Sequence, residues 1–140
     1  MIERAETPEA LARCLALRTE VFVAEQGVSA LDEQDGRDVE ATHWIATLGA
    51  RTLATARVLR TGPAAKVQRV AVARPARGTG LGATMMRTVI DAMRAEPGVE
   101  RLVLDSQLSA LGFYEKLGFV AEGETFLDAG IEHKRMTLAL

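Results

Sequence analysis

Cysteine is almost absent from this sequence, since Cys14 is the only one among 140 residues. One thiol can form neither an internal disulfide nor a cage of thiolate metal ligands, so we expect no disulfide scaffold and no metal. Cys14 also falls on the apolar stripe of a predicted helix. We therefore expect it to be a small buried hydrophobic residue rather than a nucleophile.

The sequence also lacks a strong excess of one charge and lacks long apolar runs. Its formal net charge is -2 and its pI is near 5.7, whereas nucleic-acid-binding domains normally carry a clustered basic excess. No stretch approaches the roughly 18 unbroken apolar residues of a membrane span, and residues 1–6 contain no apolar signal region. We expect a cytoplasmic protein with neither nucleic acid nor membrane as partner.

The composition is that of a folded globular chain, with 48% apolar and 26% charged residues. At 140 residues the chain fits a single domain, 1–140, and a domain of this size buries roughly 68% of its unfolded surface. Cyclic dimers dominate among soluble oligomers, so a homodimer is possible on that general ground.

Hydrophobic periodicity and turn residues predict a mixed α/β fold around one sheet. A Thr7-Pro8 start predicts a helix that runs to about Ala24. The acidic segment 27–40 is either a solvated loop or a rim that attracts an amine. The other predicted elements are strands at 1–5, 41–48, 51–59, 66–72, 101–105, 119–121 and 131–138, and helices at 80–95 and 109–117. We expect strand 101–105 to lie parallel to strand 66–72.

A glycine-rich loop joins strand 66–72 to the helix at 80–95. Its three glycines alternate with other residues, and the helix that follows directs free N–H groups towards the loop, as in phosphate-binding sites. The loop consists of Arg77, Gly78, Thr79, Gly80, Leu81, Gly82 and Ala83. The same glycines fit the Gly-x-Gly-x-x-Ala pattern of dinucleotide-binding oxidoreductases, although the chain has no room for a separate substrate domain.

A second motif follows strand 101–105 and consists of Gln107, Ala110 and Tyr114, with Leu-Gly-Phe at 117–119. Together with the glycine loop, this motif resembles the GCN5-related N-acetyltransferase (GNAT) superfamily. The family pattern has Asn where this chain has Gln107, and both amides donate and accept hydrogen bonds. The resemblance covers roughly residues 65–120.

This resemblance implies a GNAT (acyl-CoA N-acyltransferase) fold, a single mixed, mostly antiparallel sheet whose central parallel strands splay apart. Acetyl-CoA would enter between strands 66–72 and 101–105 as cosubstrate, and no metal would be needed. The acceptor would be a primary amine of a small molecule, such as a polyamine, an amino sugar or an amino acid. The expected CoA-binding residues are Val70, Ala71, Val72, residues 77–83 and Gln107.

Acetyl transfer to an amine needs an acid for the departing thiolate and a base for the ammonium proton. The resemblance implies Tyr114 as the acid. Glu33 and then His43 are the first candidates for the base, with Asp35 and His133 also possible.

We expect the substrate to contact Gln26, Asp35, Arg69 and His133. Because Arg69 lies on a central strand, its charge should be paired with a carboxylate of segment 32–38, or it should bind a substrate carboxylate. The absence of one convincing base leaves a different alternative open, a non-catalytic acyl-CoA-binding or regulatory module.

Overall fold

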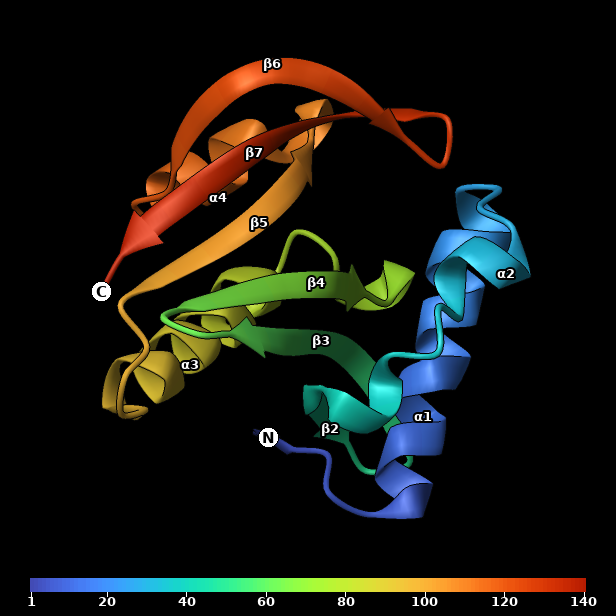
Figure 1. Cartoon of the computed structure of the whole chain (residues 1–140). Helices are drawn as coiled ribbons and strands as arrows, with labels where there is room; N and C mark the ends of the chain where they lie inside the picture. Colours follow the sequence, from blue (N-terminus) through green and yellow to red (C-terminus); the bar gives the residue numbers. More distant parts are fainter.

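The computed structural model describes all 140 residues, and one seven-stranded sheet runs through the whole molecule (Figure 1). The strands are β1 (Ile2–Arg4), β2 (Thr42–Leu48), β3 (Arg51–Thr61), β4 (Ala64–Val72), β5 (Arg101–Gln107), β6 (Val120–Asp128) and β7 (Ile131–Ala139). The helices are α1 (Pro8–Arg18), α2 (Ala30–Glu33), α3 (Leu81–Ala95) and α4 (Leu111–Lys116). No helix combines the length and apolar character that a membrane span requires.

The strand order is β1-β2-β3-β4-β5-β7-β6, and every neighbouring pair is antiparallel except β4 and β5. This confirms the predicted mixed, mostly antiparallel sheet with one parallel pair. The register of β4 with β5 extends only from Ala64 opposite Arg101 to Lys66 opposite Val103. Beyond these residues β4 continues to Val72 and β5 to Gln107, and the two strands separate.

Helices cover both faces of the sheet, as the alternation of side chains along β2 shows. Trp44 and Ala46 belong to the main core cluster, which α3 and α4 complete with residues such as Met85 and Tyr114. Ile45, between them, packs on the opposite face against Cys14 of α1. Cys14 is buried, as predicted, and burial raises the pKa of its thiol to about 11.

Several boundaries differ from the sequence prediction. The Thr7 side chain caps α1 as expected, by accepting a hydrogen bond from the Ala10 N–H at 3.1 Å. However, the α-helix ends at Arg18, and residues 19–25 form a wider π-helical segment. Strand β6 was predicted only at its start; it continues to Asp128 and forms a hairpin with β7.

A bulge in β4 lies at the point where the site begins. The register with β3 pairs Arg57 with Gln68 and Thr55 with Ala71, so one extra residue is accommodated between them. Arg69 occupies this bulge with φ of 55°, a left-handed conformation that is rare for a residue other than glycine. Such bulges bend a strand and redirect side chains.

Candidate functional site

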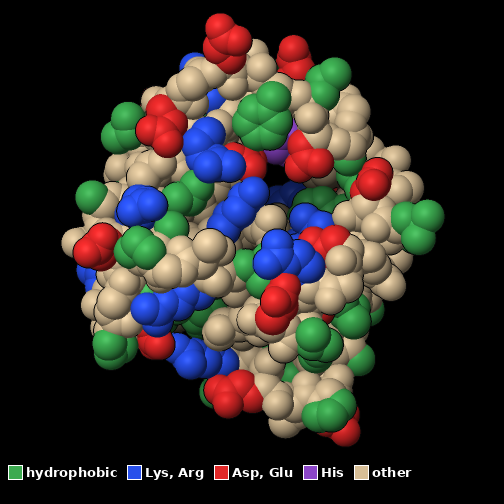
Figure 2. Space-filling model, in the orientation of Figure 1, with side chains coloured by type: hydrophobic (Ala, Val, Ile, Leu, Met, Phe, Trp, Pro, Cys, Tyr) green, Lys and Arg blue, Asp and Glu red, His purple; other side chains and the backbone are tan.

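A cavity of about 510 Å³ opens where β4 and β5 separate. Figure 2 shows it as a hollow bordered by both basic and acidic side chains. Its walls come from β4, β5, α2, α4 and the tip of the β6–β7 hairpin. Among the predicted site residues, those that line it are Gln26, Glu33, Asp35, Arg69, Val70, Gln107, Tyr114 and His133.

Tyr114 reaches the cavity from α4, which follows β5 after a single 3₁₀ turn, Leu108–Ala110. Its ring packs edge-on between Phe113 and Phe119, with centroid distances of 4.9 and 5.9 Å. Burial raises the pKa of its phenol to about 12. Tyr114 therefore presents a firmly protonated hydroxyl at the cavity, as a proton donor requires.

Six charged side chains, which we call the ion-pair cluster, hold α2 and the segment after it against α1, β3 and β4: Arg18, Arg57, Arg69, Glu33, Asp35 and Asp38. The two innermost guanidiniums, Arg18 and Arg57, are almost completely buried. Both bind Asp38, at 2.7 and 3.0 Å respectively. Three positive and three negative charges balance within the cluster, which compensates for their burial.

Asp35 and Arg69 belong to this cluster. Arg57 binds the carboxylate of Asp35 at two points, and these hydrogen bonds hold the pKa of Asp35 well below its usual range. Arg69 donates to the backbone carbonyl oxygens of Asp32 and Glu33 at 3.0 and 3.1 Å and lies 3.5 Å from the Asp35 carboxylate. The predicted pairing of Arg69 with a carboxylate of segment 32–38 is confirmed.

In the acidic segment 27–40, Glu33, Asp35 and Asp38 are accordingly neither solvated nor part of a free anionic rim, whereas Asp32 lines the cavity without an ion pair. The central carboxylates of the segment point inward to arginines of α1, β3 and β4, and they fasten the segment to the sheet. Both predicted readings of the segment are wrong for Glu33, Asp35 and Asp38, because long-range ion pairs neutralise these charges.

The two predicted bases lie in different surroundings. Glu33 lines the cavity but is 2% exposed, and its Oε1 accepts a hydrogen bond from Arg18 Nε at 2.5 Å. His43 does not line the cavity; its Nε2 lies 2.9 Å from the carbonyl oxygen of Asp38. The structure therefore does not bring His43 together with Tyr114.

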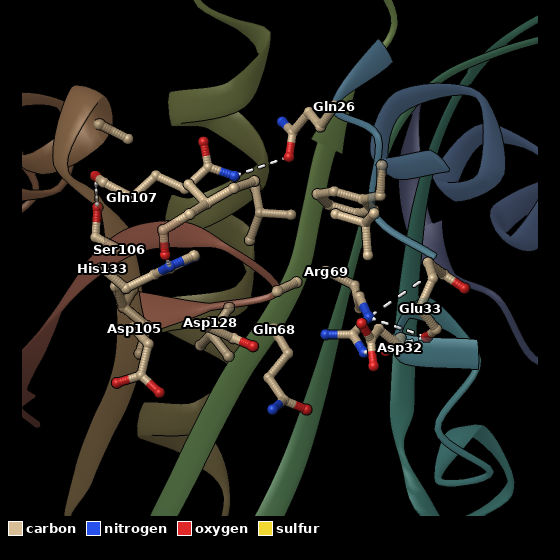
Figure 3. Close-up of a pocket in the computed structure, with 18 of the residues that line it drawn as sticks. Gln26, Asp32, Glu33, Gln68, Arg69, Asp105, Ser106, Gln107, Asp128 and His133 are labelled. Atoms are coloured by element: carbon tan, nitrogen blue, oxygen red, sulfur yellow. Dashed lines mark hydrogen bonds and ion pairs between the residues drawn. The ribbon is translucent and has the colours of Figure 1, made fainter. Parts of the chain in front are cut away.

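Gln26 and Gln107 bridge the cavity at the open end of the two strands. Gln107 Nε2 donates to Gln26 Oε1 at 2.9 Å, and this bond links the end of β5 to the end of the π-helical segment (Figure 3). The amide at position 107 thus ties together elements that are 81 residues apart in sequence.

The glycine loop lies beyond the end of β4 and does not line this cavity. Thr79, Gly80 and Leu81 line a second, shallower depression of about 440 Å³. Gly78 and Gly80 have φ of 76° and 86°, and a Cβ at either would meet no atom within 4 Å. Their backbone conformation requires glycine, and the space above them is open to a ligand.

Gly82 and Arg77 have protein partners in the structure. A Cβ on Gly82 would lie 3.4 Å from Val72 and 3.5 Å from Phe113, so this glycine allows α3 to pack closely on β4. Arg77 donates to the Val72 carbonyl oxygen at 3.0 Å and to Glu25 at 2.6 Å. Gly82 therefore also has a packing role, because its Cβ position faces the core.

The predicted site residues did not include six polar residues of the cavity, namely Asp32, Lys66, Gln68, Asp105, Ser106 and Asp128. Lys66 binds Asp105 at 3.0 Å, at the point where β4 and β5 begin to separate. Asp128 lines the cavity at the tip of the β6–β7 hairpin and forms no ion pair. The available signals were a charged Asp105 at the end of the predicted apolar strand 101–105 and an Asp128 just before an Ala-Gly turn.

These features fit a long, flexible thioester with a phosphorylated end. The separated strands leave the edge of β4 unpaired beside the cavity, where amides of such a ligand can bond to backbone groups. Apart from Leu81 N–H, which lies 3.4 Å from Thr79 Oγ1, the N–H groups at the start of α3 have no side-chain cap, and they face the open glycine loop. A sheet with separated parallel strands, a glycine loop at the following helix and a tyrosine on the cavity together define an acyl-CoA-dependent acyltransferase.

Comparison with known proteins leads to the same class. The sequence profile of the acetyltransferase (GNAT) domain matches residues 4–140, and the chain belongs to this family. It is 32% identical to the uncharacterized N-acetyltransferase YjcF of Bacillus subtilis, over 94% of each chain. The chain is therefore an acyl-CoA-dependent N-acetyltransferase.

Solved structures share the fold over nearly the whole chain. A crystal structure of an acyl-CoA N-acyltransferase from Pseudomonas aeruginosa has a TM-score of 0.87 at 29% identity, with 98% of this chain and 97% of that chain covered. A Bacillus subtilis acetyltransferase crystallised in complex with CoA has a TM-score of 0.75 at 17% identity, over 99% of this chain and 97% of that one. The predicted fold class is confirmed.

Proposed function

We propose that this protein transfers an acetyl group from acetyl-CoA to a primary amine of a small molecule. The observation that carries the proposal is the cavity between the separated strands β4 and β5, with the protonated Tyr114 hydroxyl at its wall. Its volume of about 510 Å³ lies within the range of small-molecule sites, roughly 300–1,000 Å³.

The charge of the cavity supports an amine as acceptor. Asp32 and Asp128 line it from opposite elements, α2 and the β6–β7 hairpin, and neither carboxylate forms an ion pair. Glu33 and Asp35, in contrast, are already neutralised by arginines. A cationic acceptor would supply the missing positive charge.

We assign the binding of acetyl-CoA, the acetyl donor, to β4 and the glycine loop. Backbone groups of Val70, Ala71 and Val72 would bind the pantetheine amides, and a β4 N–H would stabilise the tetrahedral oxyanion. The N–H groups of residues 78–83 would bind the pyrophosphate, with Arg77 beside them. Tyr114 would protonate the departing thiolate.

Two measurements on the full chain test this function. Release of CoA thiol from acetyl-CoA is followed with spermidine, glucosamine and lysine as acceptors, and the products are identified by mass spectrometry. We expect acetylation of at least one amine. No CoA release with any of them would favour a non-catalytic acyl-CoA-binding module.

Thermal shift measurements separate the donor from a dinucleotide. Acetyl-CoA should raise the melting temperature, and NADH should not, because a ligand that binds only the folded state stabilises it. Stabilisation by NADH alone would overturn the proposal.

A further inference from the structure

The two histidines of the chain hydrogen-bond through opposite ring nitrogens. His133 places Nδ1 2.7 Å from the Ile131 carbonyl oxygen, whereas His43 places Nε2 2.9 Å from the Asp38 carbonyl oxygen. A carbonyl oxygen can only accept, so the nitrogen beside it must carry the hydrogen. Neutral His133 therefore has its lone pair on Nε2, and neutral His43 has its lone pair on Nδ1.

His133 lies in the cavity and is held in place. In the register of the sheet, His133 pairs with Gln107 of β5 on one side and with Phe126 of β6 on the other. Its ring stacks on Phe126, with centroids 6.1 Å apart and planes 25° apart. Figure 3 shows the side chain extending from β7 into the cavity. Its Nε2 forms no hydrogen bond within the protein, and it remains available to a ligand.

The other titratable candidates are already engaged. Arg18 Nε donates a hydrogen bond to Glu33 Oε1 at 2.5 Å, and Arg57 donates to both carboxylate oxygens of Asp35. His43 lies outside the cavity. Of the four candidate bases, His133 alone keeps a ring nitrogen without a protein partner on the cavity wall, in the same cavity as Tyr114; the unpaired carboxylates of Asp32 and Asp128 also line it.

We infer that His133 is the general base of acetyl transfer, acting through Nε2. This inference rests on the proposed function and adds the group that prepares the acceptor. An acceptor ammonium gives one proton to His133 Nε2, which yields imidazolium and a neutral amine. The amine lone pair then forms the C–N bond at the thioester carbonyl carbon.

The remaining protons balance as follows. The C–S bond breaks, its electron pair stays on sulfur, and the Tyr114 hydroxyl protonates the thiolate. The positively charged nitrogen of the intermediate gives its extra proton to the tyrosinate, which restores Tyr114. His133 returns its proton to solvent, so that the net reaction releases amide, CoA thiol and one proton.

The tautomers can be tested without a substrate. In ¹⁵N-histidine-labelled protein at pH 8.5, above the usual imidazole pKa of about 6.5, long-range ¹H–¹⁵N spectra should show one histidine protonated on Nδ1 and one on Nε2. His133→Gln should remove the Nδ1–H pattern, and His43→Gln should remove the Nε2–H pattern. An Nε2–H tautomer for His133 would overturn the inference.

The catalytic role is tested with spermidine, glucosamine and lysine as acceptors. His133→Gln should lower kcat/KM by about 10²-fold or more, while acetyl-CoA still raises the melting temperature as in the wild type. Added imidazole should restore part of the turnover of His133→Ala, because it can occupy the vacated space and accept the proton. Glu132→Gln, an exposed neighbour on β7 outside the cavity, is the matched control and should keep wild-type turnover.

The acceptor itself supplies a further distinction. An alkoxyamine is largely neutral at pH 7, so its attack does not require removal of an ammonium proton. The decrease in kcat/KM caused by His133→Gln should therefore be much smaller with methoxyamine than with methylamine. An equal loss with both would show that His133 acts on something other than this proton and would overturn the inference.

The outcomes separate the two proposals. Absence of CoA release by the wild type with every amine would overturn the proposed function and the role of His133 together. An active wild type with full activity in His133→Gln would overturn the role of His133 alone.

Discussion

Arg57 and Asp35 form a two-point ion pair between the middle of β3 and the segment that follows α2. Arg57 Nη2 lies 2.6 Å from Asp35 Oδ2 and Nη1 lies 3.0 Å from Oδ1, and the Arg57 side chain is completely buried. A buried guanidinium that loses such a partner is left with an unpaired charge. This pair therefore fixes the wall of the cavity to the sheet.

We predict that Asp35→Asn lowers the free energy of unfolding at pH 7 by about 1–3 kcal/mol, less than for a fully buried pair because Asp35 is 29% exposed. The pKa of Asp35 is lowered in the fold, so its stabilisation is present above pH 4 and is lost as pH falls below that value. Urea unfolding measured between pH 7 and pH 3 should show that acid lowers the free energy of unfolding less in Asp35→Asn than in the wild type. Glu124→Gln, an exposed residue without an ion pair, should follow the wild type.

Tyr114 can be titrated by absorbance because it is the only tyrosine. Burial raises its pKa to about 12, compared with about 10 in an unfolded chain. We predict that the tyrosinate band of the native protein appears well above the pH at which the urea-unfolded protein shows it. Since the fold favours the protonated phenol, this group's contribution to stability is lost as pH rises above 10.

Tyr114→Phe provides the control, because it should abolish the tyrosinate band altogether. The same variant should lower kcat about 10²-fold or more if the hydroxyl protonates the thiolate, with acetyl-CoA binding retained. A native midpoint near pH 10 would contradict the burial, and unchanged turnover would contradict the acid role.

The order of elements and the two motifs could be predicted from the sequence because both depend on local pattern. The Thr7 cap, the glycine loop and the separation of β4 from β5 all follow from short stretches or from the family resemblance. The ion-pair cluster could not, since Arg57 and Asp35 are 22 residues apart and only the folded sheet brings them together. Nor does any local pattern predict a left-handed Arg69 within a strand.

The histidines illustrate the same limit. From the sequence, His43 and His133 are both candidates, each on a strand, and His43 ranks ahead of His133. Only the register of β7 with β5 and β6 places His133 at the cavity. The chemical state of each ring depends on a carbonyl oxygen nearby, and no residue pattern specifies that contact.

The tip of the β6–β7 hairpin contains a strained alanine. Ala129 has φ of 51° and is followed by Gly130 with φ of 77°, and a left-handed conformation costs a non-glycine residue about 1–2 kcal/mol. Asparagine tolerates this conformation better and is favoured in two-residue hairpin turns. We predict that Ala129→Asn raises the unfolding free energy by about 0.5–1 kcal/mol, measured by urea unfolding.

Ala129→Val is the opposing control, because a β-branched residue is least compatible with positive φ. It should be less stable than the wild type. If asparagine and valine shift the stability equally, the turn does not hold residue 129 in the left-handed region.

Thr55 carries the one fully buried side-chain oxygen without a hydrogen-bond partner. It lies on β3 between Ile45 of β2 and Ala71 of β4, and it is 1% exposed. A buried hydroxyl without a partner costs about 1–3 kcal/mol, and valine has nearly the same shape without the hydroxyl. We predict that Thr55→Val raises the free energy of unfolding by about 1 kcal/mol with an unchanged urea m-value.

Thr52, on the same strand, provides the matched comparison. Its Oγ1 accepts a hydrogen bond from Arg13 Nε at 3.1 Å, so Thr52→Val removes a bond that the protein uses and should bring no gain. If the two substitutions change the free energy of unfolding with opposite signs, the missing hydrogen-bond partner accounts for the effect at Thr55, and the β propensity of valine does not. A Thr55→Val protein less stable than the wild type would mean that the hydroxyl is satisfied in solution, by a bound water within the sheet.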